Sequence, residues 1–290
     1  MAVRRKSTVT RRHMLRCLTT GAATAVALPA YATIIEPRWL SVARHTAPIH
    51  GISNELRILH LSDLHYSRLV SLSFIDDAVE KGLELDPHVI CLTGDYITNG
   101  ILAVDNYQDV LSKLALHAPT FAVLGNHDGG RWAKQRGGVW ESSAMIRLLQ
   151  RSGITVLHNI NVPVRFGRDR IVFCGTGDWW SDEMSVKPTF ANSGRHPRVL
   201  LSHNPDGKGD LARERWQLML CGHTHGGQIS VPWVGRPFAP VDDTRYVHGL
   251  APWRDRQIHV TSGVGNIHGA RCNCRPEIAL VTLVPATATA

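Results

Sequence analysis

Aspartate, asparagine and histidine gather in five short clusters along this chain. The clusters are Asp63-Leu64-His65, Gly94-Asp95, Gly125-Asn126-His127-Asp128, His203 and Gly222-His223-Thr224-His225. Their donors are oxygens and imidazole nitrogens without a thiolate, a set that suits manganese, iron or zinc. Magnesium prefers oxygen ligands and water, so we do not expect it to be the sole metal. The candidate donors are too many for one ion and suit two: Asp63, His65, Asp95, Asn126, His127, His203, His223 and His225.

A pair of ions held by such donors would support one kind of reaction. Two cations roughly 4 Å apart share a carboxylate and a bridging water, whose pKa falls so that hydroxide forms near neutral pH. The hydroxide attacks phosphorus while the cations neutralise the phosphoryl oxygens. A nearby imidazole can protonate the leaving oxygen. The pattern therefore predicts a two-metal-dependent hydrolase of a phosphate ester or anhydride.

Each cluster follows a short apolar run, which must position it. The runs cover residues 56–61, 88–92, 120–124, 198–201 and 217–221, and their lack of alternation is typical of strands buried on both faces. Helical stripes at residues 72–83 and 107–114 separate the first three runs and predict β-α-β units with parallel strands. Because the carboxyl ends of parallel strands share one edge of a sheet, we expect the clusters to meet there.

The second half of the chain is richer in strands. Further apolar runs lie at residues 170–174, 257–261 and 278–283. Together with the first half they predict an α/β fold in which a two-sheet β-sandwich is flanked by helices. We expect one catalytic domain over residues 56–284, a linker over residues 33–55 containing Pro37, Pro48 and Gly51, and a tail over residues 285–290.

Residues 1–32 have the composition of a targeting peptide. Basic residues precede a mild apolar run, and Thr10-Arg11-Arg12-His13-Met14-Leu15 resembles a twin-arginine export signal. Ala30-Tyr31-Ala32 is a candidate cleavage site, and retention as an N-terminal anchor is the alternative. We therefore expect an exported protein that is periplasmic or associated with the cell envelope.

The leader also carries most of the excess positive charge. The net charge is +8, and the six basic residues of the leader account for all but +2 of it. A body this close to neutral does not demand a nucleic-acid partner. The body contains no uninterrupted apolar run of about 18 residues, so we expect no membrane-spanning helix in it.

The five clusters, in this order, resemble the calcineurin-like metallophosphoesterases, whose pattern is D-x-H, G-D, G-N-H-[DE], H and G-H-x-H. The resemblance implies a β-sandwich flanked by helices and assigns a role to each residue. Asp63, His65 and His225 would bind one metal, Asn126, His203 and His223 the other, and Asp95 would bridge them. His127 would assist the leaving group and Asp128 would orient it. The purple acid phosphatase branch has a tyrosine where this chain has Thr98; Tyr96 would point elsewhere, so a tyrosinate–iron site is not expected.

The segments S-H-N-P-D at residues 202–206 and C-G-H-T-H-G-G-Q at residues 221–228 are similar to a bacterial subgroup of exported or membrane-associated phosphodiesterases. Some relatives in that subgroup act on UDP-2,3-diacylglucosamine in lipid A synthesis. The resemblance therefore implies a small-molecule or lipid phosphate substrate and allows association with a membrane surface. A phosphomonoesterase or a nuclease on the same site remains an alternative, as does a non-catalytic metal-dependent scaffold.

A basic and aromatic segment follows the His127 cluster. Glycines at both ends of residues 129–138 would let it close as a lid over the metals. Arg131 and Arg136 are candidates to contact a second phosphate, and Trp132 to contact an acyl chain or a base. The alternative is a solvated loop whose tryptophans pack into the core. Cys272-Asn273-Cys274 could bind a metal or form a strained bridge, although a structural or incidental role is the simpler interpretation.

Overall fold

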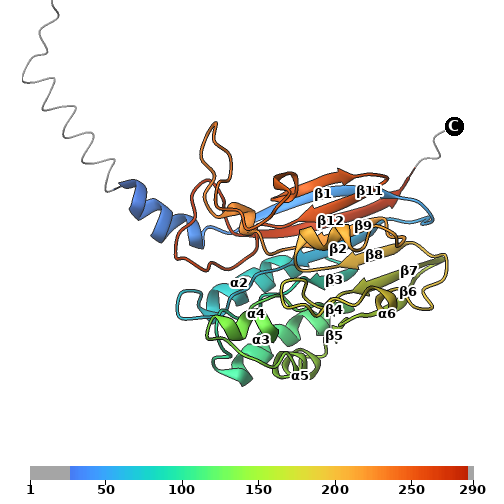
Figure 1. Ribbon diagram of the computed structural model, residues 1–290, viewed down its shortest axis with the longest axis horizontal. Helices are drawn as coiled ribbons and strands as arrows, with labels where there is room; N and C mark the ends of the chain where they lie inside the picture. The colour runs from blue at the N-terminus through green and yellow to red at the C-terminus, as the bar shows by residue number, and fades with distance from the viewer. Residues whose placement is uncertain (1–26, 287–290) are drawn as a thin grey trace, which may run out of the picture.

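The computed structural model describes residues 27–286, which form two six-stranded sheets packed face to face with helices on their outer faces (Figure 1). The strand order of the first sheet is β1 (Ser41–Ile49), β12 (Glu277–Pro285), β2 (Leu56–Leu61), β3 (Val89–Leu92), β4 (Thr120–Ala122) and β5 (Thr155–Val156). The order of the second is β10 (Gly249–Trp253), β11 (Arg256–Val260), β9 (Leu218–Cys221), β8 (Arg198–Leu201), β7 (Asp169–Gly175) and β6 (Ile160–Phe166). The predicted two-sheet sandwich flanked by helices is confirmed.

Three apolar clusters hold these layers together. Residues such as Ile58, Phe121 and Leu218 come from both sheets and fill the space between them. A second cluster packs the outer face of the first sheet against α2 (Leu72–Leu83), α3 (Val104–His117) and α5 (Ser143–Arg151). A third covers the outer face of the second sheet, near α6 (Val186–Thr189). Strands between two such layers are apolar on both faces, which explains the continuous apolar runs.

The two predicted helices occur where the apolar stripes lie. Helix α2 begins after Ser71, whose Oγ accepts a hydrogen bond from the Phe74 N–H (3.2 Å), and it ends before Pro87. Helix α3 buries Tyr107, Val110, Leu111 and Leu114. Each helix connects two parallel strands of the first sheet, so the predicted β-α-β units are confirmed. Strands β5, β6 and β10 and helix α5 are too short or too irregular in pattern to have been predicted.

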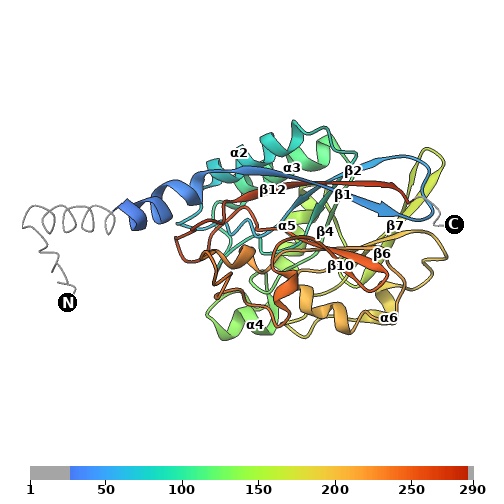
Figure 2. The same ribbon diagram turned by 90° about the horizontal axis from the view of Figure 1, so that it is seen from above.

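The predicted linker over residues 33–55 is wrong for its central part. Residues 41–49 form β1, which pairs in parallel with β12 along its whole length, from Ser41 opposite Glu277 to Ile49 opposite Pro285. Figure 2 shows the blue β1 beside the red β12, although they stand at opposite ends of the chain. Pro48 is tolerated because β1 is an edge strand, where a missing N–H faces no neighbour. Pro285, expected in the tail, also belongs to β12.

The segment before β1 is attached to the body as well. The π-helical turn η1 (Tyr31–Ile35) and the 3-10 turn η2 (Glu36–Arg38) precede it. The buried carboxylate of Glu36 accepts hydrogen bonds from the backbone N–H groups of Asn273 (3.0 Å) and Cys274 (2.5 Å). No helix within residues 27–286 is long and apolar enough to cross a bilayer. The twin-arginine motif lies outside the described residues.

Candidate metal centre

The residues predicted to bind metal follow the carboxyl ends of parallel strands. Strands β2, β3 and β4 run parallel in one sheet, and β8 and β9 in the other. Asp63 and His65 follow β2, Asp95 follows β3, Asn126 follows β4, His203 follows β8, and His223 and His225 follow β9. The two sheets present these ends at the same side of the sandwich, so the side chains converge as expected.

The backbone at this edge adopts a conformation that side chains rarely favour. Five of the seven predicted ligands have a left-handed backbone, with φ between 47° and 70°: Asp63, His65, Asp95, His223 and His225. Such residues persist only where the surroundings enforce them, and they concentrate at functional sites. The neighbouring glycines are required for close approach: a Cβ on Gly222 would overlap the side chains of Ser62 and Asp63, and one on Gly125 would overlap the Asp95 carboxylate.

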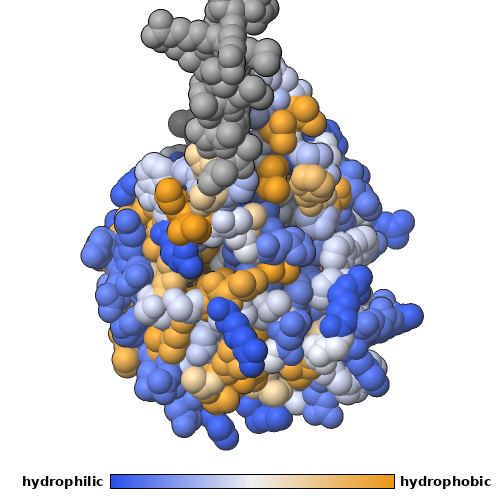
Figure 3. Space-filling model, turned by 90° about the vertical axis from the view of Figure 1, so that its left-hand side faces the viewer, coloured by the Kyte–Doolittle hydropathy of each residue, from blue (hydrophilic) through white to orange (hydrophobic). Residues whose placement is uncertain are grey.

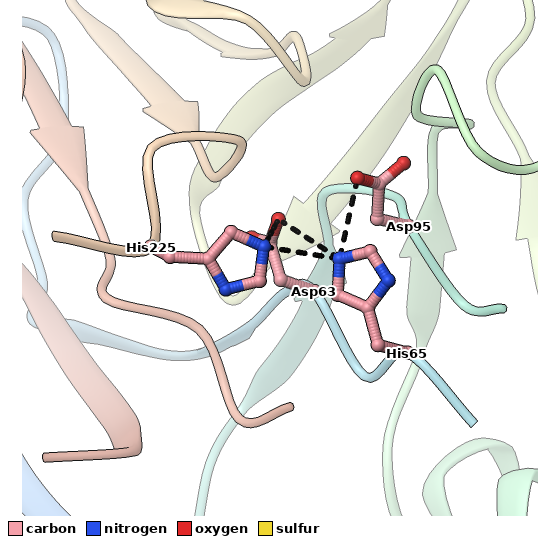
Figure 4. A group of neighbouring side chains, drawn as sticks. All are labelled: Asp63, His65, Asp95 and His225. Atoms are coloured by element: carbon pink, nitrogen blue, oxygen red, sulfur yellow. Dashed lines mark hydrogen bonds and ion pairs between the residues drawn. The ribbon is translucent and has the colours of Figure 1, made fainter. Parts of the chain in front are cut away.

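Four of the side chains form a compact group (Figure 4). Asp63, His65, Asp95 and His225 are buried, and each offers one ligand atom within 4.8 Å of the other three. His225 Nε2 lies 3.3 Å from Asp63 Oδ1 and 3.0 Å from His65 Nε2. His65 Nε2 lies 3.4 Å from Asp95 Oδ2. Two carboxylate oxygens and two imidazole nitrogens facing one point are a suitable set of ligands for a divalent cation.

The other three predicted ligands form a second group next to the first. Asn126 Oδ1 lies 3.1 Å from His203 Nε2 and 2.9 Å from His223 Nδ1. His203 Nε2 is also 3.2 Å from Asp95 Oδ2. The same oxygen of Asp95 therefore faces His65 of the first group and His203 of the second. This is the position that a carboxylate shared by two cations must occupy.

The electrostatics of the site favour cations. Burial lowers the pKa of both His65 and His223 to about 3 and holds that of His225 well below its usual range, so these imidazoles are neutral and keep a free lone pair. Burial acts to raise the pKa of Asp95, but His203 and His127 outweigh it and hold this pKa well below its usual range.

The pair formed by Asp95 and His203 also has a consequence for metal binding. Burial acts to lower the pKa of His203, but Asp95 raises it to about 10. A bound cation would take the place of that imidazolium proton, because metal binding to histidine releases protons. The chemistry and spacing of the donors thus fit divalent metal ions.

His127 lies beside these groups, but its predicted orienting partner is wrong. Its imidazole Nδ1 lies 2.7 Å from the backbone carbonyl of Thr98, to which it donates in the matching tautomer. The carboxylate of Asp128 instead accepts hydrogen bonds from the backbone N–H groups of Asp95 (2.7 Å), Tyr96 (2.8 Å) and Gly125 (2.8 Å). Asp128 therefore braces two metal loops against each other. The motif could not reveal this, because the partners of Asp128 are backbone groups.

The positions of Thr98 and Tyr96 relate to the prediction that the site holds no tyrosinate–iron bond. Thr98 Oγ1 lies 3.3 Å from His65 Nδ1, so Thr98 contacts two histidines of the site. Tyr96 is buried, and its hydroxyl donates to the carbonyl of Val123 (3.0 Å) rather than entering the metal groups. Tyr96 thus points away from the metal groups, as the sequence indicated.

A cavity of about 800 Å³ opens beside the metal groups. Its walls include Asp95, Asn126, His127, His223 and His225 and the apolar side chains of Ile229, Phe238 and Ile267. Trp132, from the short helix α4 (Gly130–Gln135), and Trp180 also line it, stacked with ring centroids 5.7 Å apart. Trp132 lies 4.6 Å from the His127 ring and Trp180 lies 4.1 Å from the His223 ring, both measured between centroids.

The structure separates the two arginines predicted to contact substrate. Arg136 lines the cavity and stacks over Trp132, with its guanidinium carbon 3.9 Å from the ring centroid. Arg131 is exposed on α4 and is not among the residues that line the cavity. The glycine-flanked segment is therefore a helix at the rim of the site, with Trp132 and Arg136 directed to the cavity.

Sequence reasoning missed a buried arginine behind the site. Arg271 is completely buried, and its guanidinium donates to the carbonyls of Ser262 (2.8 Å), Gly263 (3.1 Å), Gly265 (2.6 Å) and Cys274 (3.1 Å). The loop that Arg271 holds in place also contacts the metal site directly, because the Gly265 N–H donates a hydrogen bond to the carbonyl of Asp63 (2.6 Å). No pattern in the sequence marks Arg271, because its partners are carbonyls of an irregular loop.

Sequence reasoning also missed Asp178, although this residue follows the carboxyl end of a strand as the predicted metal ligands do. It follows β7 at the same edge, is buried, and burial raises its pKa to about 6.

The two cysteines of the C-x-C motif are free thiols, and Cys274 is buried with its Sγ 3.2 Å from the carbonyl of His225. Neither cysteine belongs to the group formed by Asp63, His65, Asp95 and His225.

Comparison with known proteins agrees with this geometry. The calcineurin-like phosphoesterase family matches residues 56–227. The chain is 44% identical over 256 residues to phosphodiesterase YaeI of Escherichia coli (strain K12), covering 88% of this chain and 92% of the relative. It is 26% identical to UDP-2,3-diacylglucosamine pyrophosphatase LpxG of Chlamydia trachomatis, covering 91% and 95%. It is 29% identical to the uncharacterised metallophosphoesterase YkuE of Bacillus subtilis (strain 168), covering 93% and 94%. The chain therefore belongs to the calcineurin-like phosphoesterase family of hydrolases.

Proposed function

We propose that this protein is a two-metal-dependent phosphodiesterase or pyrophosphatase that acts in the cell envelope on a phosphate substrate with an apolar group. The observation that carries the proposal is the position of Asp95. Its Oδ2 faces His65 (3.4 Å) and His203 (3.2 Å), one from each donor group, beside a cavity with largely apolar walls.

The donor groups divide between two cations. Asp63, His65 and His225 would hold the first, Asn126, His203 and His223 the second, and Asp95 both. Bound cations would supply an activated water and neutralise the phosphoryl oxygens. The low pKa that burial gives to His65 and His223 keeps these imidazoles ready to bind without first losing a proton.

His127 is suited to protonate the leaving group. Donation from its Nδ1 to the Thr98 carbonyl fixes the ring, which leaves Nε2 as the nitrogen that gains and gives up a proton. His127 also lines the cavity, so a leaving oxygen bound there can reach it. Aromatic packing of Trp132 against the ring restricts its rotation.

The cavity supports the choice of substrate class. Trp132, Trp180, Ile229 and Phe238 present apolar surface within one cavity that also contains the metal-binding side chains. An acyl chain or a base linked to the phosphate would be buried there, and Arg136 at the rim would meet a second phosphate. A nucleotide-linked lipid such as UDP-2,3-diacylglucosamine, named for the LpxG relative, combines these features. The basic leader of residues 1–32 would deliver the enzyme to the envelope.

Turnover by metal-depleted protein reloaded with Mn²⁺, Fe²⁺, Zn²⁺ or Mg²⁺ tests this proposal. We expect hydrolysis of an aryl phosphodiester with the first three metals and little with Mg²⁺ alone, and preference for UDP-2,3-diacylglucosamine over a short-chain analogue. Arg136→Ala should raise KM for the diphosphate substrate more than for the aryl phosphodiester. Arg131→Ala is the matched control and should change neither. A preference for aryl phosphomonoesters, or for DNA, would contradict the substrate class.

A further inference from the structure

We propose that the face carrying the catalytic cavity docks on an anionic phospholipid bilayer through an apolar loop, residues 231–238. This loop follows η4 (His225–Gly227), the turn that contains the metal-site residue His225. Trp233 at its tip is fully exposed (103%), and Val234 and Phe238 are each 69% exposed. Apolar side chains exposed together mark an interaction surface rather than ordinary solvent-facing loop.

The loop holds its apolar tip outward by its own backbone. Val231 and Gly235 exchange two hydrogen bonds, 2.8 Å and 2.9 Å long, which close a tight turn around Trp233. Trp233 has φ 65°, a left-handed conformation that a bulky side chain adopts only under constraint. A strained backbone that presents a tryptophan to solvent is a feature to explain by function. Tryptophan is also the residue that prefers the level of lipid headgroups.

The loop is attached to the catalytic site at both of its ends. Ile229 before it and Phe238 within it line the catalytic cavity. The Arg236 side chain lies so close to Gly226 and Gly227 that a Cβ at Gly227 would come within 2.8 Å of it. Docking of the tip would therefore hold the cavity mouth at the docked surface.

The N-terminal helical segment extends the same face. Ile34 and Ile35 are 59% and 53% exposed on η1, and Leu69 is 62% exposed. The Arg271 N–H donates to the carbonyl of Ala32 (2.8 Å), which places η1 against the loop at residues 266–270. Residues 267, 268 and 270 of that loop line the catalytic cavity, while residues 266 and 269 line a neighbouring hollow with Thr33 and Leu69. Figure 3 looks at this face and shows apolar side chains gathered on it.

The positive charge of this face favours an anionic bilayer as the surface that docks there. Arg38 and Arg68 line the neighbouring hollow beside η1, with Asp77 as the acidic side chain there. The described chain begins on this side of the molecule, next to these two arginines (Figure 1). Basic residues beside apolar anchors match anionic headgroups, each adding to surface affinity, and two signals together give stable attachment where one gives marginal binding.

A probe at the loop tip tests the proposal in the full chain. Cys17 and Cys272 are replaced by serine, since the other four cysteines are buried, and Trp233→Cys is labelled with a polarity-sensitive fluorophore. Leu116→Cys is the matched control, because Leu116 is 86% exposed at the end of α3, just before β4 begins at the opposite edge of the sheet. We expect vesicles containing phosphatidylglycerol to shift the emission of the probe at position 233 to the blue and to leave the probe at position 116 unchanged.

A second variant measures how much the tip contributes. Trp233→Ser with Val234→Ser should weaken binding to these vesicles by at least about tenfold, while turnover of a soluble aryl phosphodiester stays at the wild-type rate. The turnover control distinguishes membrane docking from the proposed catalytic function, because either proposal can be wrong while the other holds. Equal shifts at both probes, no shift at position 233, or unchanged affinity of the serine variant would overturn the proposal. A shift without vesicles that accompanies dimer formation would assign the loop to a second copy instead.

Discussion

Asp128→Asn separates the brace seen in the structure from the orienting role that the motif suggests. The carboxylate uses Oδ2 for the N–H groups of Asp95 and Gly125 and Oδ1 for that of Tyr96. Asparagine has nearly the same shape but only one oxygen, so its amide nitrogen must face at least one backbone N–H group. Hydrogen bonds to a charged acceptor contribute roughly 1.5–3 kcal/mol each, and a buried donor left without a partner adds a penalty.

The net cost is smaller than the sum of the lost hydrogen bonds. Burial raises the pKa of Asp128 and Asp95 raises it further, so removing this charge relieves desolvation and repulsion. We therefore expect Asp128→Asn to lower the free energy of unfolding by about 2 kcal/mol. Because the bridged loops carry Asp95 and Asn126, Mn²⁺ affinity should fall roughly 10–100-fold.

Two measurements check this expectation. Urea unfolding of chelator-treated protein, followed by tryptophan fluorescence, gives the stability without metal, and calorimetric titration with Mn²⁺ gives the affinity. His127→Gln is the matched control, because it should slow turnover of substrates with poor leaving groups without changing either quantity. If Asp128→Asn kept full stability and metal affinity yet reproduced the kinetic defect of His127→Gln, the brace would be refuted and the orienting role restored.

Three further predictions follow from single contacts. Arg271→Met should lower the free energy of unfolding by roughly 3 kcal/mol, because several buried carbonyls lose their donor, and thermal unfolding with Arg271→Lys as partial rescue checks it. His225→Ala should reduce bound manganese from two ions to one per chain, as counted by elemental analysis. Burial acts to raise the pKa of Glu277, but His248 (Nε2 to Oε2, 2.6 Å) outweighs it and lowers this pKa to about 2. In the unfolded chain the pKa of Glu277 is near 4.5, so on acidification the unfolded chain takes up a proton at this carboxylate before the folded protein does. Above pH 4.5 the ionised carboxylate therefore stabilises the fold by roughly 3 kcal/mol, and this contribution is lost as the pH falls toward 2. Glu277→Gln should therefore flatten the dependence of the unfolding midpoint on pH between 4.5 and 2.

The sequence by itself determined the parallel arrangement of β2, β3 and β4 and the convergence of the donor side chains that follow them. Apolar runs of strand length, separated by amphipathic helices, leave few alternatives to parallel β-α-β units. Parallel strands place their carboxyl ends together, so Asp63, Asp95 and Asn126 had to meet. Local pattern was sufficient here because each feature depends on residues close together in the chain.

Features made by contacts between distant segments were decided only by the tertiary structure. Strand β1 looks like a linker, with Pro48 inside it, because an edge strand is defined by its partner β12 more than 230 residues away. Asp128 and Arg271 bind backbone groups whose positions depend on how the loops fold, so residue type alone could not predict their partners. The exposure of Trp233 likewise became visible only once the remaining apolar side chains had been buried. Spacing in the chain predicts which groups share an edge, but packing decides which atoms touch.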